Sequence, residues 1–524
     1  MNMQHKTLEE FVLSLPGSYA LSEKQQDNVT KLTEVSKKFL QRAKIPCPES
    51  QSVSANTVVL ESGHQPNFLP YPGTWKKAFC LNWIRNTLHH EGHESVSFFG
   101  LADQNLSTAR ILTKNQVPAL NKDGFIKIGY KINEQDKFRS FSKVQKPSYE
   151  QWESEIKRIE HHYQDITRKT RSETSLLKKQ GDTLFEILWS SYDIASNAAE
   201  INSFVFAKIC YELLAVDAGF FLYSDMHHEQ FFLLEAKQLL RNVFRFNEIY
   251  NRVIAEKGLD IPPVTPNHIP FWYECECGGK TDLIINDFTA EGTCNLCKKE
   301  YHLPFGDDFS HLSRYYHAMD FNAVSRNIAM AHGLGDSLFL SGLGGSLQYG
   351  QISCTISEEL GFHRPVFFGW RSGDYYLGMA HSAAVHELMK QFGLTLSDFL
   401  TPALNKKIAT RFRQITDTIQ TAESHNNQKE LMYWSGILGN AKNQLMFARK
   451  LFSSSSSFLD ILANQQAASI CQFWKEALER AEMQLEQGFH RIHQDILYHP
   501  PILSDIPPDD LPAFYNNIRN SEVG

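Results

Sequence analysis

The chain has 524 residues, a formal net charge of −7, 42% hydrophobic residues and nine cysteines. This length predicts about three structural units with sizeable cores, and the ordinary share of apolar residues excludes wholesale disorder. The mild acidity argues against a broad nucleic-acid-binding surface, and no run of about 18 apolar residues predicts a membrane span. The N-terminus lacks the features of a signal peptide, so we expect a cytoplasmic protein.

The first part of the chain has the pattern of an α/β fold. Residues 1–55 predict an N-terminal helical extension, and a β-branched run at 58–60 then predicts a strand. A turn rich in proline and glycine, a helix at about 75–90 and a second strand at 96–100 follow. This order favours a parallel sheet covered by helices. We therefore assign 56–145 to the first half of a Rossmann-like core.

The later segments predict insertions into this core and a helical C-terminal region. We expect a helical insertion at 146–215, a continuation of the core at 216–260 and a cysteine-containing insert at 261–305. The second half of the core follows at 306–384, and a C-terminal helical coiled-coil region at 385–524. The fold class is thus α/β with helical insertions. The helical regions at about 150–190 and 430–495 could form a coiled coil that makes a homodimer, or pack together within one chain.

Four cysteines predict a zinc ribbon within the insert. Cys275 and Cys277 form a C-x-C pair, and Cys294 and Cys297 form a C-x-x-C pair sixteen residues later. Two thiol pairs on tight turns suit a tetrahedral Zn²⁺ ion, and a closed site with four ligands is structural, since no position remains for a substrate. The first pair has only one intervening residue, so His302 is the alternative ligand to Cys275.

The turn after the first predicted strand is a candidate binding site. It reads Gly63-His64-Gln65-Pro66-Asn67, and ligands of open α/β sheets bind beyond the carboxyl ends of strands. A histidine there could donate to a phosphate or polarise an acyl group, and Lys77, in the following helix, could neutralise an anion. The alternative is a surface loop in which the histidine has only a structural role.

Three other strand ends carry polar or glycine-rich sequences. The second predicted strand ends in Asp103, Gln104 and Asn105. A later strand leads into a turn whose candidate ligand-binding residues are Gly342, Gly344, Gly345, Ser346 and Gln348. Such turns let a backbone approach a phosphate or carboxylate closely. Arg371 and Ser372 end the next strand, where Arg371 could bind an anionic group; an ordinary surface arginine is the alternative.

Three segments together resemble the cysteine-adding enzymes of bacillithiol biosynthesis, the BshC family. They read SGHQPNFLPYPGTWKKA, FFGLADQN and LFLSGLGGSLQYGQISCTISEELGFHRPVFFGWRSG. The chain departs from the family in having Lys76-Lys77 where a His-Lys pair is usual, in having Asp103 as the single acid of its cluster, and in the cysteine insert. The resemblance implies a Rossmann-like fold related to class I aminoacyl-tRNA synthetases. No KMSKS-like loop or anticodon-binding signature accompanies it.

The resemblance implies a ligase that joins an amino acid, with cysteine expected, to the amine of a small acceptor. ATP or ADP is the implied nucleotide. Under this hypothesis His64, with Gln65, stabilises phosphate or acyl charge, Lys77 neutralises it, Asp103 binds the amine or a hydroxyl, and Arg371 binds a carboxylate. The remaining strand-end residues would contact substrate or nucleotide, namely Gly63, Asn67, Gln104, Asn105, Gly342, Gly344, Gly345, Ser346, Gln348 and Ser372.

Two other functions fit the same sequence. The fold could transfer or attach a nucleotide without forming an amide, as an adenylating enzyme or nucleotidyltransferase does. Alternatively, the chain could be a non-catalytic scaffold that acts through its coiled coil and ribbon. We expect small-molecule substrates and neither a membrane nor a nucleic acid as partner.

Overall fold

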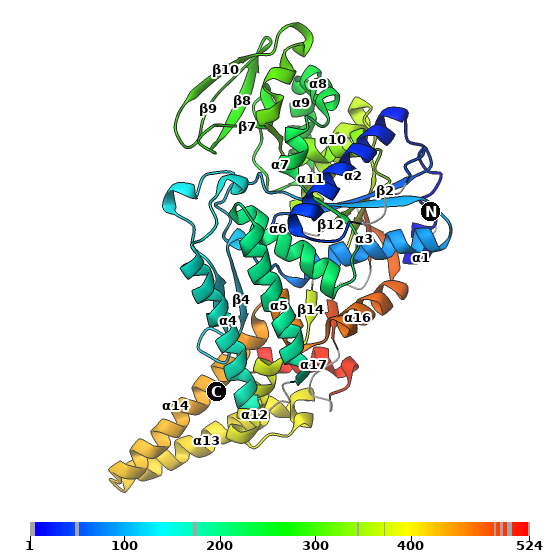
Figure 1. The fold of residues 1–524 in the computed structure, drawn as a ribbon. Helices are drawn as coiled ribbons and strands as arrows, with labels where there is room; N and C mark the ends of the chain where they lie inside the picture. Colours follow the sequence, from blue (N-terminus) through cyan, green and yellow to red (C-terminus); the bar gives the residue numbers. More distant parts are fainter. Residues whose placement is uncertain are drawn as a thin grey trace.

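A computed structural model describes the chain at residues 6–47, 52–170, 175–342, 345–370, 373–486, 489–492, 496–499 and 506–521. It is a mixed α/β protein with a large, mainly parallel sheet and many helices (Figure 1). None of the described helices is long and apolar enough to span a lipid bilayer.

The central sheet has eight strands, of which six run parallel. In spatial order the strands are β1 (Lys6–Thr7), β15 (Glu482–Glu486), β16 (Phe489–Ile492), β13 (Val366–Gly369), β12 (Leu338–Ser341), β2 (Val58–His64), β3 (Ser95–Leu101) and β6 (Gly219–Leu222). The strands from β16 to β6 are parallel, whereas β15 and β1 are paired antiparallel at one edge. The sheet thus has a parallel interior and an antiparallel margin.

The order of the parallel strands reverses between β2 and β12. Along the chain, β2, β3 and β6 extend the sheet to one side, and β12, β13 and β16 extend it to the other. Numbered in chain order, this is the 3-2-1-4-5-6 arrangement of doubly wound dinucleotide-binding folds. The connections leave β2 and β12 toward opposite faces, so a crevice opens beyond their carboxyl ends. The α/β prediction is confirmed, and its crevice lies after His64.

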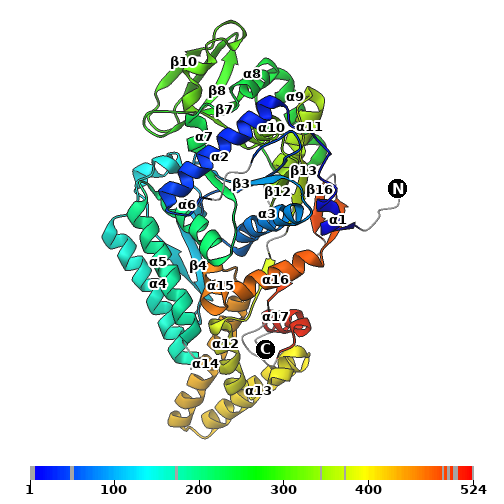
Figure 2. The same ribbon diagram turned by 45° about the vertical axis from the view of Figure 1, so that its right-hand side comes forward.

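Two layers of helices cover the sheet because alternate strand residues face opposite sides. Val58 and Leu60 pack in one core cluster with α1 (Leu8–Val12), α3 (Pro72–His90), α6 (Ala198–Lys208) and α16 (Ala467–Glu479). Val59 packs in another cluster with α2 (Glu23–Ala43), α9 (Val243–Lys257), α10 (Ala323–Leu334) and α11 (Gly345–Leu360). Figure 2 shows these layers on either side of the strands.

Insertions between the core strands add two further units. The first contains a hairpin of β4 (Lys114–Pro118) and β5 (Phe125–Gly129) and the helices α4 (Tyr149–Thr170) and α5 (Ser175–Ile194). After β6 come α7 (Tyr223–His228) and α8 (Leu233–Arg241), and then an antiparallel sheet of β10 (Glu300–Pro304), β9 (Thr289–Thr293), β8 (Lys280–Asn286), β7 (His268–Glu274) and β11 (Met319–Phe321). This second sheet therefore extends beyond the insert expected at 261–305.

The C-terminal region contains helices, as expected, but returns to the core as strands. α12 (Met379–Phe392) leads to α13 (Ala403–Ser424) and α14 (Gln428–Ser453), which form a hairpin projecting from the body (Figure 1). α15 (Phe458–Asn464), α16 and α17 (Leu511–Arg519) pack closer to the core. β15 and β16 lie in a region expected to be helical, and they form strands there because Met483, Phe489 and Ile492 are buried at the sheet margin.

A buried ion pair ties the C-terminal region to the core. Lys76 of α3 lies 2.6 Å from Asp374 of β14 (Gly373–Tyr375), a strand parallel to β17 (Ile496–Tyr498). Trp474 Nε1 donates to the other carboxylate oxygen of Asp374 at 2.8 Å, and His499 Nε2 lies at the same distance from that oxygen. Burial alone would raise the pKa of Asp374, but the Lys76 charge and the His499 hydrogen bond hold it at about 2. Lys76 is therefore structural.

We expect Lys76→Met to reduce the free energy of unfolding by about 3–5 kcal/mol, because it leaves the buried Asp374 charge without its cation. Urea unfolding followed by circular dichroism measures this loss. Lys38→Met is the matched control, since the Lys38–Glu229 pair is exposed and solvent screens its attraction, so its loss should leave stability nearly unchanged. Equal effects of the two substitutions would contradict the structural role of Lys76.

Candidate functional site

A cavity of about 370 Å³ lies at the reversal point of the sheet, and we call it the switch-point cavity. Gly63, His64 and Gln65 line it from the end of β2, and Ala102 and Asn105 from the end of β3. The second sheet and α10 complete its wall, chiefly through Trp272, Lys280, Phe321 and Arg326. Open α/β sheets bind ligands in this position.

The lining of the switch-point cavity suits an anion that carries a flat ring. Its charged side chains are Lys280 and Arg326, and none of the described lining residues is a carboxylate. Amide groups of Gln65, Asn105, Asn322 and Asn327 supply further polar contacts, and the lining aromatic residues are Tyr223, Trp272, Phe321, Phe339 and Tyr349. Guanidinium and ammonium groups bind phosphates and carboxylates, and ring faces stack on flat ligands.

His64 lies at the mouth of this arrangement in its neutral form. Its Nδ1 is 3.0 Å from the carbonyl oxygen of Gln65, and because a carbonyl only accepts, Nδ1 carries the proton and Nε2 an open lone pair. Burial, with help from the Lys77 charge, lowers the pKa of His64 to about 3. A pKa this low keeps the ring neutral, so Nε2 is suited to accept a hydrogen bond but is a weak proton acceptor. The predicted stabilisation of phosphate charge requires the other tautomer. Asn67 is buried beside it.

Lys77 contacts the backbone at the end of β2. Its Nζ donates to the carbonyl oxygen of Gly63 at 2.6 Å and lies 5.8 Å from the centre of the Phe99 ring. Burial lowers the pKa of Lys77 to about 7. Lys77 is not one of the described residues that line the switch-point cavity. Its predicted role as a direct neutraliser of an anion therefore stays a prediction, and its observed contact holds the Gly63 peptide.

The three polar residues after β3 point to different places. Asn105 lines the switch-point cavity, whereas Asp103 lines a neighbouring one. Asp103 is buried and accepts hydrogen bonds from the Ser224 backbone at 3.0 Å and from its hydroxyl. Burial raises the pKa of Asp103 to about 7 despite the Ser224 hydrogen bonds. Gln104 is buried between them, with no hydrogen-bond partner for its side-chain amide among the described residues.

The glycine-rich turn is described only in part. Gly342 follows β12, and α11 begins at Gly345 and includes Ser346 and Gln348. The candidate ligand residues Gly344, Arg371 and Ser372 lie outside the described residues. Gln348 is half-buried, and its neighbour Tyr349 is the residue of α11 that lines the switch-point cavity.

Sequence reasoning missed a buried network under the cavity floor. The Tyr223 hydroxyl donates to Glu61 Oε1 at 3.1 Å, and the Arg326 guanidinium lies 4.8 Å from the centre of the Tyr223 ring. Burial raises the pKa of Glu61 despite the Tyr223 hydrogen bond and the Arg326 charge. A Cβ atom at Gly100 would lie 2.6 Å from the Tyr223 ring, so a glycine is needed there. The sequence feature that could have revealed this network was Glu61, an acidic residue within an otherwise apolar strand.

Lys280 and Asp320 form the wall between the two cavities. Lys280 Nζ lies 3.1 Å from Asp320 Oδ2, and both side chains are buried. Lys280 faces the switch-point cavity, and Asp320 lines the neighbouring cavity of about 210 Å³ that also contains Asp103. One ion pair therefore separates a cationic region from an acidic one.

The four cysteines predicted to bind zinc lie together. Their Sγ atoms are all within 4.8 Å of one another, with Cys275 and Cys297 at 3.5 Å and Cys277 and Cys294 at 3.6 Å. Thiolates 2.3 Å from a tetrahedral zinc ion lie roughly 3.8 Å apart, so this set fits the metal. The alternative ligand His302 lies on β10, where its Nδ1 is 3.1 Å from Glu291.

The cysteine cluster positions Lys280 directly. The Lys280 backbone N–H donates to the Asn295 side chain at 2.8 Å, and its carbonyl accepts from the Asn295 backbone at 2.9 Å. Asn295 follows Cys294, and Gly279 accepts from the Cys275 N–H at 2.8 Å. The two cysteine turns thus hold the first residue of β8, whose side chain reaches the switch-point cavity. Metal binding here would order a cavity residue as well as the insert.

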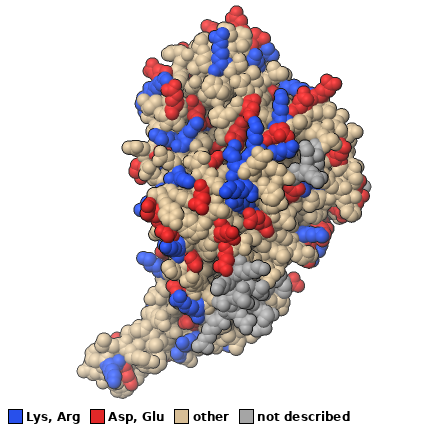
Figure 3. All heavy atoms as spheres, viewed as in Figure 1, with Lys and Arg blue, Asp and Glu red and all other residues tan. Residues whose placement is uncertain are grey.

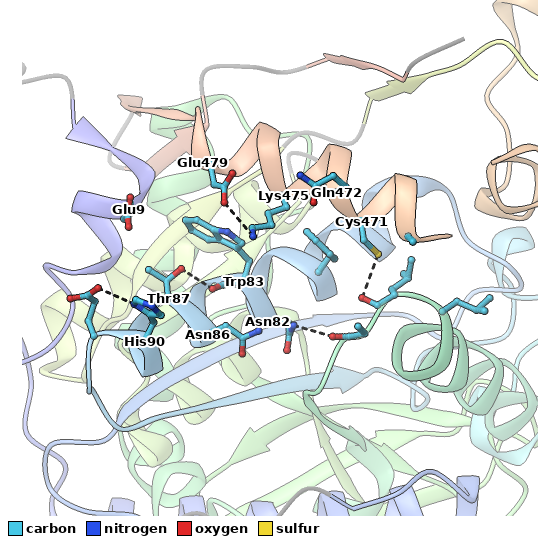
Figure 4. Close-up of a pocket in the computed structure, with 16 residues that line it drawn as sticks. Glu9, Asn82, Trp83, Asn86, Thr87, His90, Cys471, Gln472, Lys475 and Glu479 are labelled. Carbon is cyan, nitrogen blue, oxygen red and sulfur yellow. Dashed lines mark hydrogen bonds and ion pairs between the residues drawn. The ribbon is translucent and has the colours of Figure 1, made fainter. Parts of the chain in front are cut away.

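A larger cavity of about 870 Å³ lies elsewhere, between α3 and α16 (Figure 4). Asn82 on its floor donates to the Ala215 carbonyl at 3.3 Å, just before β6 begins, so this cavity is remote from the carboxyl ends of the strands. Its charged groups pair locally, as in Lys475 with Glu479 at 3.6 Å. Figure 4 shows no convergence of these groups on one point, and we place the candidate site in the switch-point cavity.

Comparisons with known proteins leave the family open. No protein family and no curated protein matches the chain. Among solved structures, a crystal structure described as a "putative arginyl t-RNA synthetase" from Campylobacter jejuni aligns with 84% of this chain and 98% of its own at 10% identity, with a TM-score of 0.23. With a TM-score this low, we base no argument about fold or function on that similarity.

We expect Cys294→Ser to lose most of its bound zinc and to lower the melting temperature by about 5 °C or more, because structural zinc contributes folding energy. Elemental analysis of dialysed protein and thermal unfolding measure the two effects. Cys47→Ser is the control, since Cys47 is exposed and outside the cluster. Wild-type protein that carries no zinc after purification with added zinc would refute the metal site.

Proposed function

We propose that this chain is a ligase that binds a nucleotide in the switch-point cavity and joins the carboxyl group of an amino acid, expected to be cysteine, to the amine of a small acceptor. The observation that carries the proposal is the cationic lining of a cavity at the reversal point of a doubly wound sheet. The BshC-like segments around Gly63 and Asp103 support the choice of reaction.

The cavity has groups for each part of a nucleotide. Arg326 presents a planar guanidinium that can bind two phosphate oxygens, and Lys280 adds a second positive charge. The rings of Trp272 and Tyr349 offer faces for a base. Lys280 also contacts Asp320, so Arg326 is expected to contribute more of the attraction. These groups are suited to bind and orient an anionic ligand.

The nucleotide, when bound, supplies a phosphate leaving group on the carboxyl carbon of the amino acid. His64 Nε2, as a neutral acceptor, can accept a hydrogen bond from the reacting amine. Lys77 keeps the Gly63 peptide in place and so orients the His64 backbone. The first contribution comes from the last residue of β2 and the second from α3.

The surface charge supports a small-molecule substrate. On the face seen in Figure 3, lysine and arginine side chains are interspersed with aspartate and glutamate. Nucleic-acid-binding proteins instead gather basic residues into a patch or stripe. We therefore place the positive charge that matters for function inside the cavity.

We expect ATP to raise the melting temperature of the wild-type protein, and Arg326→Met to weaken ATP binding by about ten- to a hundredfold, because a charged hydrogen bond contributes about 1.5–3 kcal/mol. Isothermal titration calorimetry measures the affinity. Lys257→Met, an exposed change at the end of α9, is expected to leave it unaltered. CTP binding with no effect of cysteine would favour a nucleotidyltransferase, and binding of no nucleotide would favour a scaffold.

We expect mass spectrometry to detect an amide when the protein is incubated with ATP, cysteine and a panel of primary amines. His64→Phe should slow its formation by about two- to tenfold, because it removes a hydrogen-bond acceptor that contributes about 0.5–1.5 kcal/mol, with ATP affinity within threefold of wild type. Full activity of a folded His64→Phe protein would remove His64 from the mechanism.

A further inference from the structure

A second cavity, of about 210 Å³, opens where β3 and β6 end, and we call it the acidic cavity. Its lining carboxylates are Asp103, Glu200, Asp225, Glu274 and Asp320. Lys143 is the one lysine or arginine among its described lining residues. This composition is the reverse of that of the switch-point cavity, which has two cations and no described lining carboxylate.

Most of these carboxylates have a cation, but the balance is still negative. Arg42 lies 2.5 Å from Asp225 and 3.5 Å from Glu200, and Lys143 lies 3.1 Å from Glu274. The Lys280 contact accounts for Asp320. Three cations thus serve four carboxylates, while Asp103 accepts only neutral hydrogen bonds from Ser224 and Asp320 is shared with the other cavity.

A buried histidine gives a second and independent indication of a ligand. The side chain of His227 lines the acidic cavity, is only 3% exposed and has no hydrogen-bond partner at either ring nitrogen among the described residues. Its closest acid is Asp320, whose Oδ1 lies 3.6 Å from Nε2. The Ser142 hydroxyl in the same lining is also buried without a partner. Such groups cost about 1–3 kcal/mol each unless something binds them.

An organic cation fits the acidic cavity better than a metal ion does. Among the described residues, the cysteine cluster is the group whose ligand atoms are close enough together to hold an ion. The acids of this cavity surround a larger space, and several of them already contact Arg42 or Lys143. An ammonium group has three donors that can reach separate acceptors, whereas a metal needs its ligands gathered around one point.

The two cavities share their dividing wall. Asp103 and Asn105 face different cavities, as do Ser224 and its neighbour Tyr223, and the Lys280–Asp320 pair lies across the boundary. An anionic ligand on one side and a cationic ligand on the other would therefore be neighbours near the ends of β3 and β6.

We propose that the acidic cavity is the subsite for the amine acceptor, which binds as a primary ammonium ion held by Asp103, Asp320 and His227. This inference rests on the proposed ligase function and names the charge state and location of its second substrate. Asp103 accepts one proton from the ammonium ion. The amine nitrogen then forms a bond to the activated carboxyl carbon, and the bond from that carbon to the phosphate oxygen breaks, with the phosphate keeping the electron pair. The departing phosphate takes the second proton of the nitrogen.

The test compares trans-4-aminocyclohexanol with trans-1,4-cyclohexanediol, which differ only in an ammonium group replaced by a hydroxyl. We expect the full-length protein to bind the amine at least tenfold more tightly than the diol in calorimetric titrations, with ATP present or absent. Asp103→Asn should weaken amine binding at least tenfold, while its affinity for ATP stays within threefold of that of the wild type. Asp123→Asn, an exposed change between β4 and β5, is the matched control.

A second variant keeps the inference testable if the Asp103→Asn protein does not fold. Asp225 is partly exposed at the edge of the cavity, so Asp225→Asn should fold and weaken amine binding by about threefold or more. Equal binding of amine and diol by wild type overturns the inference even if ATP binds, and stoichiometric Mg²⁺ binding that Asp103→Asn abolishes overturns it in favour of a metal. Amine selectivity without any nucleotide binding would instead overturn the ligase proposal and keep the cationic subsite.

Discussion

The site depends on one ion pair contributed by the second sheet. Lys280 of β8 and Asp320 of β11 meet above the carboxyl ends of the parallel strands and divide that edge into a cationic and an acidic cavity. In a buried setting, two opposite charges hold each other firmly, because separating them would leave each without water or partner. The chemistry available to the core therefore depends on a sheet inserted between its two halves.

This arrangement gives the cysteine cluster a role beyond folding the insert. Structural zinc sites contribute folding energy through ligands that converge only in the folded state. Here both cysteine turns hydrogen-bond to the segment that begins β8, and Lys280 is its first residue. A metal bound at the cysteines would thus stabilise the position of a cavity cation, without itself approaching a substrate.

Local sequence was enough to locate the half of the site that lies on one continuous segment. The apolar run at 58–60, the turn at His64 and the polar string at Asp103 each follow rules of strand and turn composition. Their placement at strand ends was therefore predictable. Arg326 and Tyr223 were not, because α10 and α7 carry no local motif for binding. Helix position alone also cannot tell whether a lysine such as Lys77 faces a cavity or a backbone carbonyl.

The amino-acid sequence by itself determined the α/β class, the grouping of four cysteines and the polar strand ends, because these follow from periodicity and spacing along the chain. Only the tertiary structure decided that the strand order reverses between β2 and β12, that β15 and β16 return to the central sheet, and that Lys280 reaches the core. Each of these depends on contacts between segments far apart in the chain, and such contacts leave no trace in local composition.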